Sequence, residues 1–290
     1  MMEPRYQHTV AQPISIEGIG VHSGQPCMIE CHPAPSNYGI SFEKRGEAST
    51  KQFLNDMLTT QDETNPAQRR TIIGVNQAVY ETVEHFMAAL WTLGISNLRI
   101  IAQGQEFPIL DGSAKDYIQL LKKTGVTSQD DLRPIVHIEE PLFVSANLSA
   151  ILVLPHDRFR ISYTLDYLNT SLRAQVLSED IDPDYFEKEI APARTFCLEG
   201  EAQALLQQGL GKGANYENTL VIGPHGPIKN MYRFADECAR HKVLDLVGDL
   251  ALLNADMQAH VIAVRSGHQL NNQIRNLIAN QRRTTHVSVN

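Results

Sequence analysis

"ARHKVLDLVGDL", residues 239–250, places a histidine, a lysine and two aspartates within an otherwise apolar segment. The apolar spacing predicts a helix, which turns by about 100° per residue. On such a helix His241, Asp245 and Asp249 fall within about 80° of one another and share one edge. The apolar surface comes from Leu244, Leu246, Val247 and Leu250. The segment therefore predicts a largely buried helix that carries a line of charge.

The spacing of His241 and Asp245 fits two ligands of one metal ion, because residues four apart lie one helical turn apart. HExxH metalloproteases use the same geometry with two histidines. The spacing alone more often marks a surface ion pair, and Arg240 and Lys242 allow a purely electrostatic cluster. Charge beside a broad apolar face is costly unless it is paired or metal-bound, which favours the metal. Cys238 is interpreted as a small core residue rather than a soft ligand.

The composition is that of a globular protein with a sizeable core. The chain has 290 residues, which is enough for two ordinary domains. Of these, 42% are hydrophobic and 20% are charged. The net charge of −8 argues against a general nucleic-acid-binding protein, which would carry a basic face. No apolar run approaches the roughly 18 residues of a membrane span, and no targeting peptide is recognised. Four scattered cysteines do not form a disulfide framework, so we expect a cytoplasmic protein.

Strands precede helices in each half of the chain. In the first half we expect strands within 7–45, a helix over 80–93 ended by Gly94, a strand at 97–102 and a helix at 114–125. In the second half we expect strands at 135–144, 149–155 and 159–167, helices at 199–210 and 234–253, a strand at 259–264 and a helix at 269–278. The polar segment 55–70 is expected to be an exposed insert.

The polar segment 126–134, which ends in proline, is the best candidate for a domain boundary. It predicts a first α+β domain over residues 1–127, a second over 134–280 and a loose tail over 281–290. The two halves share an order of elements without a detectable residue-level repeat. The predicted fold class is therefore α+β with two layered domains.

Two further histidines stand in stretches that suit catalysis. In "TVEHFMAAL", residues 82–90, Glu84 and His85 are adjacent, so a metal on His85 would leave Glu84 beside it as a general base. In "VRSGHQLNN", residues 264–272, His268 occupies a strand-to-helix turn, where functional residues are common. The alternatives are a solvated glutamate with a packed histidine, and a loop histidine without a role. "GIGVHSG", residues 18–24, is either a tight hairpin or a backbone approach to a ligand.

The segment 193–221 combines polar Thr195 with an apolar stretch and a glycine-rich end. The end lacks the spacing of a phosphate-binding loop. The apolar positions are either one face of a helix packed on its sheet or an apolar slot for an acyl chain. These positions are Leu198, Leu205, Leu206 and Leu210.

Six motifs together resemble one family, the zinc-dependent UDP-3-O-acyl-N-acetylglucosamine deacetylases of lipid A biosynthesis. In order they are "GVHSG" (20–24), "TVEHFMAAL" (82–90), "FPILDGSA" (107–114), "ARTF" (193–196), "RFADECARHKVLDLVGDL" (233–250) and "SGHQLNN" (266–272). The series covers nearly the whole chain, which makes it highly specific. The resemblance implies two domains of similar topology, each a β-sheet layered with α-helices, with the active site between them. It also implies an acyl passage at about 193–221.

The resemblance assigns roles to particular residues. It implies that Glu84 is the general base and His268 the general acid or oxyanion-stabilising cation, kept protonated by Asp249. Thr195 would help to hold the oxyanion. Zn²⁺, with water in its open fourth position, would be bound by His85, His241 and Asp245.

Substrate contacts are implied along the whole length of an acylated UDP-sugar. They fall on Lys242, Phe196, Leu198, Tyr167, Glu201 and Arg265. Two positions depart from the family pattern. Cys197 stands where members often have a small residue, and Ser149 stands near the position of a lysine that some members bring to the nucleotide.

The implied activity is zinc-dependent hydrolysis of the substrate's acetamide, which releases acetate. We expect a monomer that uses neither nucleic acid nor a membrane span. One alternative is a catalytically silent protein of the same fold that binds the nucleotide sugar and its acyl chain. Another is a hydrolase that holds a divalent ion with Asp245 and Asp249, although two histidines in the proposed set favour zinc over magnesium.

Overall fold

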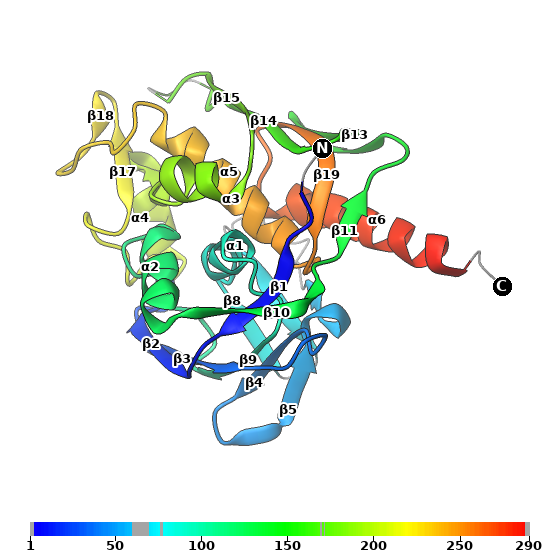
Figure 1. Cartoon of the computed structure of the whole chain (residues 1–290). Coiled ribbons are helices and arrows are strands. Elements are labelled where there is room, and N and C mark those ends of the chain that lie inside the picture. Colours follow the sequence, from blue (N-terminus) through cyan, green and yellow to red (C-terminus); the bar gives the residue numbers. More distant parts are fainter. Residues whose placement is uncertain (1–2, 60–69, 76–77, 169, 171, 288–290) are drawn as a thin grey trace.

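The structure is a computed structural model that describes residues 3–59, 70–75, 78–168, 170 and 172–287 (Figure 1). It confirms the predicted α+β class, because helices pack on several mainly antiparallel sheets. The expected insert at 55–70 lies largely outside the described residues. None of the helices in the described ranges is long and apolar enough to cross a membrane.

The first half of the chain forms a five-stranded sheet from β2 (Ile14–Ile19), β3 (Pro26–Pro33), β4 (Ile40–Lys44), β5 (Glu47–Phe53) and β9 (Leu98–Gln103). Across the sheet the order is β2-β3-β9-β4-β5. Only β4 and β9 run parallel; the other neighbours are antiparallel. In β3 the side chains of alternate residues are buried, so one face of the sheet packs on the core.

The second half forms a sheet from β12 (Leu142–Ala146), β13 (Ser149–Pro155), β14 (Phe159–Leu165), β15 (Gln175–Asp180) and β19 (Asp256–Val264), with β11 (Ile135–His137) paired to β19. The order β12-β13-β19-β14-β15 repeats that of the first sheet. The parallel pair is β14 and β19, which corresponds to β4 and β9 in the first sheet. This repetition is compatible with two domains of similar topology. Their boundaries stay a prediction.

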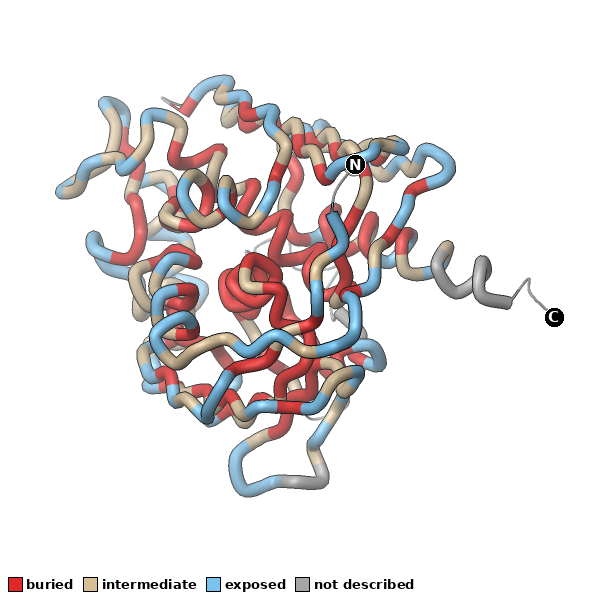
Figure 2. The backbone as a smooth tube through the Cα atoms, viewed as in Figure 1, coloured by how far each residue is buried: buried red, intermediate tan, exposed pale blue. Residues whose placement is uncertain are grey.

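Corresponding helices of the two halves meet at the centre of the molecule. Helix α1 (Glu84–Thr92) precedes β9, and α5 (Glu237–Ala251) precedes β19. The helices α2 (Lys115–Thr124) and α6 (His268–Val287) follow those strands. Helices α1 and α5 pack on each other, and Figure 2 shows both as largely buried backbone. All nine residues of α1 are buried, so this helix has no solvent-exposed face.

Four helix boundaries can be compared with the sequence. Helix α1 is shorter than the helix expected over 80–93, because its first part belongs to β8 (Ala78–Glu81) and Thr82 has φ +57°, outside the right-handed helical region. Gly94 and Gly125, both with positive φ, end α1 and α2 as predicted. Helix α6 continues to Val287, so the end expected at residue 278 is wrong. The loose tail stays a prediction.

The polar boundary segment is itself a strand. Strand β10 (Val126–Leu132) pairs antiparallel with β1 (Tyr6–Val10) in a two-stranded ribbon. Beside this ribbon, Asp256 of β19 accepts hydrogen bonds from Arg133 Nε (3.0 Å) and Arg5 Nε (2.9 Å). The Arg5 guanidinium carbon also lies 5.1 Å from the centroid of the Trp91 ring in α1. Arg5 therefore contacts elements of both halves.

The remaining elements are short. One three-stranded sheet consists of β6 (Leu58–Thr59), β7 (Ile72–Val75) and β8. Another consists of β16 (Phe196–Leu198), β17 (Leu220–Gly223) and β18 (Gly226–Pro227). The helix expected over 199–210 is α4 (Glu199–Gln207), and the short helical segments are η1 (Leu54–Asp56), α3 (Pro183–Tyr185) and η2 (Phe186–Ile190).

Candidate active site

Helices α1 and α5 cross in close contact, and a glycine allows it. A Cβ added to Gly248 of α5 would lie 2.1 Å from the backbone oxygen of Glu84, the first residue of α1. A helical glycine is ordinarily less favourable than alanine by about 1 kcal/mol. Here the missing side chain lets the two backbones approach, which brings the first turn of α1 against α5.

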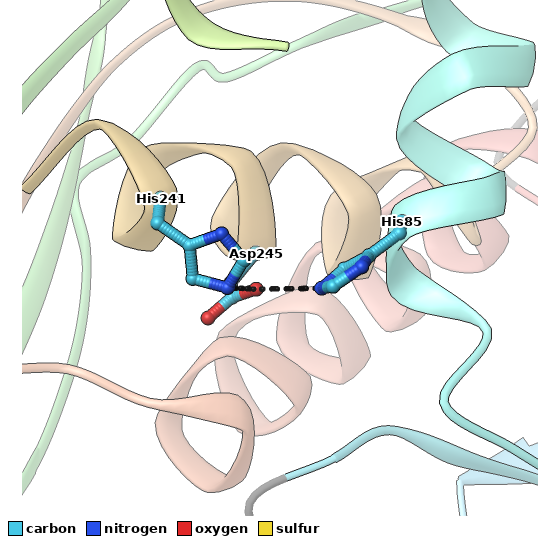
Figure 3. A group of neighbouring side chains, drawn as sticks. All are labelled: His85, His241 and Asp245. Carbon is cyan, nitrogen blue, oxygen red and sulfur yellow. Dashed lines mark ion pairs between the residues drawn. The ribbon is translucent and has the colours of Figure 1, made fainter. Parts of the chain in front are cut away.

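Three buried side chains converge at this crossing (Figure 3). His85 extends from α1, and His241 and Asp245 extend from α5, one turn apart. Asp245 Oδ1 lies 3.3 Å from His241 Nε2 and 3.7 Å from His85 Nε2. One potential ligand atom from each residue lies within 4.8 Å of the other two. The structure thus brings the three predicted metal ligands together.

The polar atoms of this group fit a bound cation. His241 Nδ1–H donates to the Ala193 carbonyl oxygen (3.0 Å), which leaves the Nε2 lone pair facing Asp245. Burial lowers the pKa of His241 to about 3, so this imidazole is neutral. Among the described residues, none donates a hydrogen bond to the buried Asp245 Oδ1. A buried carboxylate oxygen without a donor is costly unless a cation completes its surroundings.

Charge around the group keeps Asp245 ionised. Burial by itself would raise the pKa of this carboxyl, but the positive charges of Lys242 and His268 hold it well below the usual range. Lys242 Nζ donates to Asp245 Oδ2 at 2.8 Å. Burial opposes the charge on Lys242, but Asp245 outweighs it and raises the pKa of the ammonium group. One carboxylate and two imidazoles form a donor set that suits a divalent transition metal.

Glu84 lies beside the three predicted ligands and is 2% exposed. Its Oε2 accepts a hydrogen bond from the backbone N–H of Thr71 (3.1 Å), and its Oε1 lies 3.7 Å from His268 Nε2. Burial raises the pKa of Glu84, because a charged carboxylate loses its hydration there. A carboxylate with a raised pKa accepts a proton more readily near neutral pH, as a general base must.

His268 faces Glu84 from the start of α6. Its Nδ1 donates to Asp249 Oδ2 at 2.9 Å, and Asn271 Nδ2 donates to the same oxygen at 2.8 Å. Burial disfavours the imidazolium, but the carboxylates of Asp249, Glu84 and Asp245 outweigh it and raise the pKa of His268 to about 9. His268 therefore carries a proton at neutral pH, with Nε2 directed between two carboxylates.

A cavity of about 390 Å³ opens beside these residues. Most of the predicted site residues line it, namely Glu84, His85, Tyr167, Thr195, Phe196, His241, Lys242, Asp245, Arg265 and His268. Asp249 is fully buried behind His268. A smaller recess of about 180 Å³ shares Tyr167, Lys242 and Arg265 with the cavity.

Two predicted substrate contacts lie outside this lining. Glu201 Oε2 accepts a hydrogen bond from the Leu198 backbone N–H (3.1 Å) at the start of α4. Four leucines of the segment 193–221 suit either a packed helix face or an acyl slot. Of these, Leu205 lines the cavity, together with Cys197 and Ala214 from the same segment. The substrate roles of Leu198 and Glu201 stay predictions.

The "GVHSG" stretch forms the turn between β2 and β3, and Glu106 holds it. The backbone N–H groups of His22 and Ser23 each donate to the Glu106 carboxylate at 2.8 Å. Thr82, two residues before Glu84, donates its hydroxyl to the same carboxylate at 3.2 Å. His22 lines the cavity. The turn is therefore fixed against the segment that leads into α1.

Sequence reasoning missed three residues of the site. Thr71 contacts both Glu84 and Asp249, but it follows a polar stretch whose composition gives no signal. Arg70 lines the cavity and donates to Glu81 at 2.8 Å. Gly248 stands in the middle of a predicted helix, where a glycine that costs stability is itself a signal of close packing.

The chain is similar to one known family over most of its length. Residues 7–280 match the family model described as UDP-3-O-acyl N-acetylglycosamine deacetylase. A Chlamydia trachomatis protein is 36% identical over 276 residues, which cover 94% of this chain and 95% of the relative. Proteins of Oleidesulfovibrio alaskensis and Syntrophotalea carbinolica are each 35% identical, over 92% and 95% of this chain and 86% and 88% of their own lengths. All three relatives bear the name UDP-3-O-acyl-N-acetylglucosamine deacetylase. With its predicted ligands converging in one buried site, the chain belongs to the UDP-3-O-acyl N-acetylglycosamine deacetylase family.

Proposed function

We propose that this protein is a zinc-dependent hydrolase that converts UDP-3-O-acyl-N-acetylglucosamine and water into UDP-3-O-acyl-glucosamine and acetate. In the family that the motifs resemble, this reaction belongs to lipid A biosynthesis. The observation that carries the proposal is the convergence of His85, His241 and Asp245 beside Glu84 and His268. This set joins a metal site to a base and an acid within one cavity.

The donor set supports zinc as the metal. Two imidazoles and one carboxylate are typical of catalytic zinc, which keeps a fourth position open. Oxygen-rich sites, by contrast, suit magnesium or calcium. Zinc held by His85, His241 and Asp245 would supply Lewis acidity, which lowers the pKa of water and polarises a carbonyl group.

Glu84 acts as the general base. It removes a proton from the water molecule as the water oxygen attacks the acetamide carbonyl carbon. Its raised pKa brings it closer to the pH at which the enzyme works, and the Thr71 N–H holds Oε2 in place. Glu84 is not one of the three converging ligands, so it remains available for proton transfer.

His268 acts as the general acid. The amine is a poor leaving group until it is protonated, and His268 Nε2 delivers that proton as the C–N bond breaks. Asp249 accepts the Nδ1–H of His268, which fixes the ring and stabilises its positive charge. Acetate and the free amine of the sugar are then the products.

Thr195 and Lys242 line the same cavity and interact with the substrate there. The Thr195 hydroxyl donates to the oxyanion that forms on the carbonyl, which is the kind of interaction that contributes strongly to amide hydrolysis. Lys242 extends past the Phe196 ring, with Nζ 5.5 Å from the ring centroid. Its ammonium group, together with Arg265, suits the diphosphate of the nucleotide, and Tyr167 suits the uracil ring.

The acyl chain of the substrate occupies the apolar part of the same cavity. Cys197, Leu205 and Ala214 contribute to its lining, and all three belong to the predicted passage at 193–221. Cys197 is 9% exposed and stands next to Phe196. We therefore assign the side chain of Cys197 to the wall of the acyl passage.

The test is acetate release from the acylated nucleotide sugar by the purified protein. We expect turnover that is lost on treatment with a chelator and restored by about one equivalent of zinc per chain. Mass spectrometry of the sugar product should show the loss of one acetyl group. Binding of the substrate without acetate release would instead identify a silent binding protein. Full activity in protein freed of metal would rule out the metal mechanism.

A further inference from the structure

Thr71 contacts both sides of the site through different atoms. It is 1% exposed and immediately precedes β7. Its backbone N–H donates to Glu84 Oε2 (3.1 Å), and its carbonyl oxygen accepts the N–H of Thr82 (2.9 Å). The main chain of Thr71 is thus bound to the segment that begins α1 and to the general base itself.

The side chain of Thr71 contacts the general acid, His268, and its partner Asp249. Its hydroxyl donates to Asp249 Oδ1 and lies 3.1 Å from His268 Nδ1. The other oxygen of Asp249, Oδ2, accepts from His268 and from Asn271. Asp249 is fully buried, so water does not replace a missing donor at Oδ1 without rearrangement.

We propose that Thr71 is a positioning residue that sets the geometry between the general base and the general acid. Its hydroxyl fixes the rotation of the Asp249 carboxylate, which orients the His268 ring, while its N–H fixes Glu84. The inference rests on the function proposed above. In one catalytic cycle Glu84 takes a proton from the attacking water and His268 gives a proton to the leaving amine. Both groups therefore need a defined place relative to the same carbonyl group.

Variants that remove or keep the Thr71 hydroxyl distinguish a positioning role from a role in packing alone. Thr71→Val keeps the volume and the backbone N–H but leaves Asp249 Oδ1 without its Thr71 donor. Thr71→Ser keeps the hydroxyl and loses only a methyl group. Thr92→Val is the matched control: Thr92 is buried in α1, and its hydroxyl donates to the Ala88 carbonyl oxygen (2.8 Å) rather than to the site.

We expect Thr71→Val to lower kcat by a factor on the order of 10 to 100, since small misplacements of reacting groups have effects of that size. KM and the zinc content should stay within about two-fold of the wild type, because the substrate and metal contacts remain. Thr71→Ser and Thr92→Val should retain nearly full kcat. If Thr71→Val does not fold, Thr71→Ser and Thr71→Ala form a second pair that differs only in the hydroxyl.

A second measurement does not depend on turnover. In metal-free protein with isotope-labelled histidine, the Nδ1–H signal of His268 should be protected from solvent exchange in the wild type and in Thr71→Ser. It should exchange faster in Thr71→Val. Equal kcat and equal exchange in Thr71→Val and the wild type would overturn the inference. A loss of kcat in Thr71→Ser as large as that in Thr71→Val would also overturn it. A wild-type protein that releases no acetate would instead refute the proposed function.

Discussion

Replacement of Gly248 by alanine should part helices α1 and α5 and weaken the metal site. The added Cβ would lie 2.1 Å from the carbonyl oxygen of Glu84 and 2.8 Å from its carbonyl carbon, and no side-chain rotation can move these backbone atoms. Because ordinary van der Waals contact begins at 3.4 Å, the helices must separate by about 1.3 Å in a core that is otherwise close-packed. His85 follows Glu84 directly and would move with it, away from the two ligands on α5.

A shift of this size exceeds what a metal site tolerates, since bond lengths are held within about 0.2 Å. We therefore expect zinc affinity to fall by a factor on the order of 10 to 100, as it does when the support of metal ligands is lost. The free energy of unfolding should fall by about 1–3 kcal/mol through overpacking. Competition with a chelating dye gives the affinity, and denaturant unfolding of the metal-free protein gives the stability.

Gly200→Ala is the matched control for this experiment. Gly200 is also helical, but a Cβ added there meets no atom within 4 Å. This variant should keep its zinc affinity. A Gly248→Ala protein with wild-type zinc affinity would refute the reasoning, because the close crossing would then not determine the spacing of the ligands.

Three further outcomes follow from the same geometry. Glu84→Gln should lower kcat by a factor on the order of 10² to 10⁴ while zinc remains bound, because a base is lost and a ligand is not; unchanged kcat in acetate release would contradict this role. His241→Ala should lose tight zinc in a metal assay, whereas His260→Ala, on β19 and away from the cavity lining, should retain it; full zinc in His241→Ala would exclude the ligand assignment. In metal-free protein the pKa of His268 is raised from 6.5 to about 9, so its contribution to stability is complete below about pH 6.5 and is lost as the pH rises through about 9. Unfolding measured from about pH 6 to 10 should show this loss, and His268→Gln should remove it; identical profiles for the two proteins would contradict the assignment.

The motifs predicted the reactive side chains of the site better than the residues and helix contacts that hold them in place. Helical spacing placed His241 and Asp245 on one edge of a helix, but the full ligand set and the roles of Glu84 and His268 came from the resemblance to the family. The meeting of α1 with α5 is a long-range contact that no local pattern contains. Thr71 enters the site through that tertiary arrangement, so its contacts with Glu84 and Asp249 could not be predicted from the sequence.

Two element boundaries show why patterns alone fall short. The residues just before Glu84 suit a strand as well as a helix, and α1 has no exposed face to mark where it begins. Strand β10 is mostly exposed in a two-stranded ribbon, so its sequence lacks the buried alternation that identifies a strand. In both cases the structure depends on pairing with another strand: β8 pairs with β7, and β10 pairs with β1.

The contacts of Arg5 have a practical consequence. This side chain joins Asp256 of β19 to the Trp91 ring of α1, only a few residues from the amino end. A fusion partner attached at that end would crowd an anchor shared by the two halves. The opposite end leaves the body of the molecule along α6 (Figure 1), which makes it the better point for a purification tag or for immobilisation on a sensor surface.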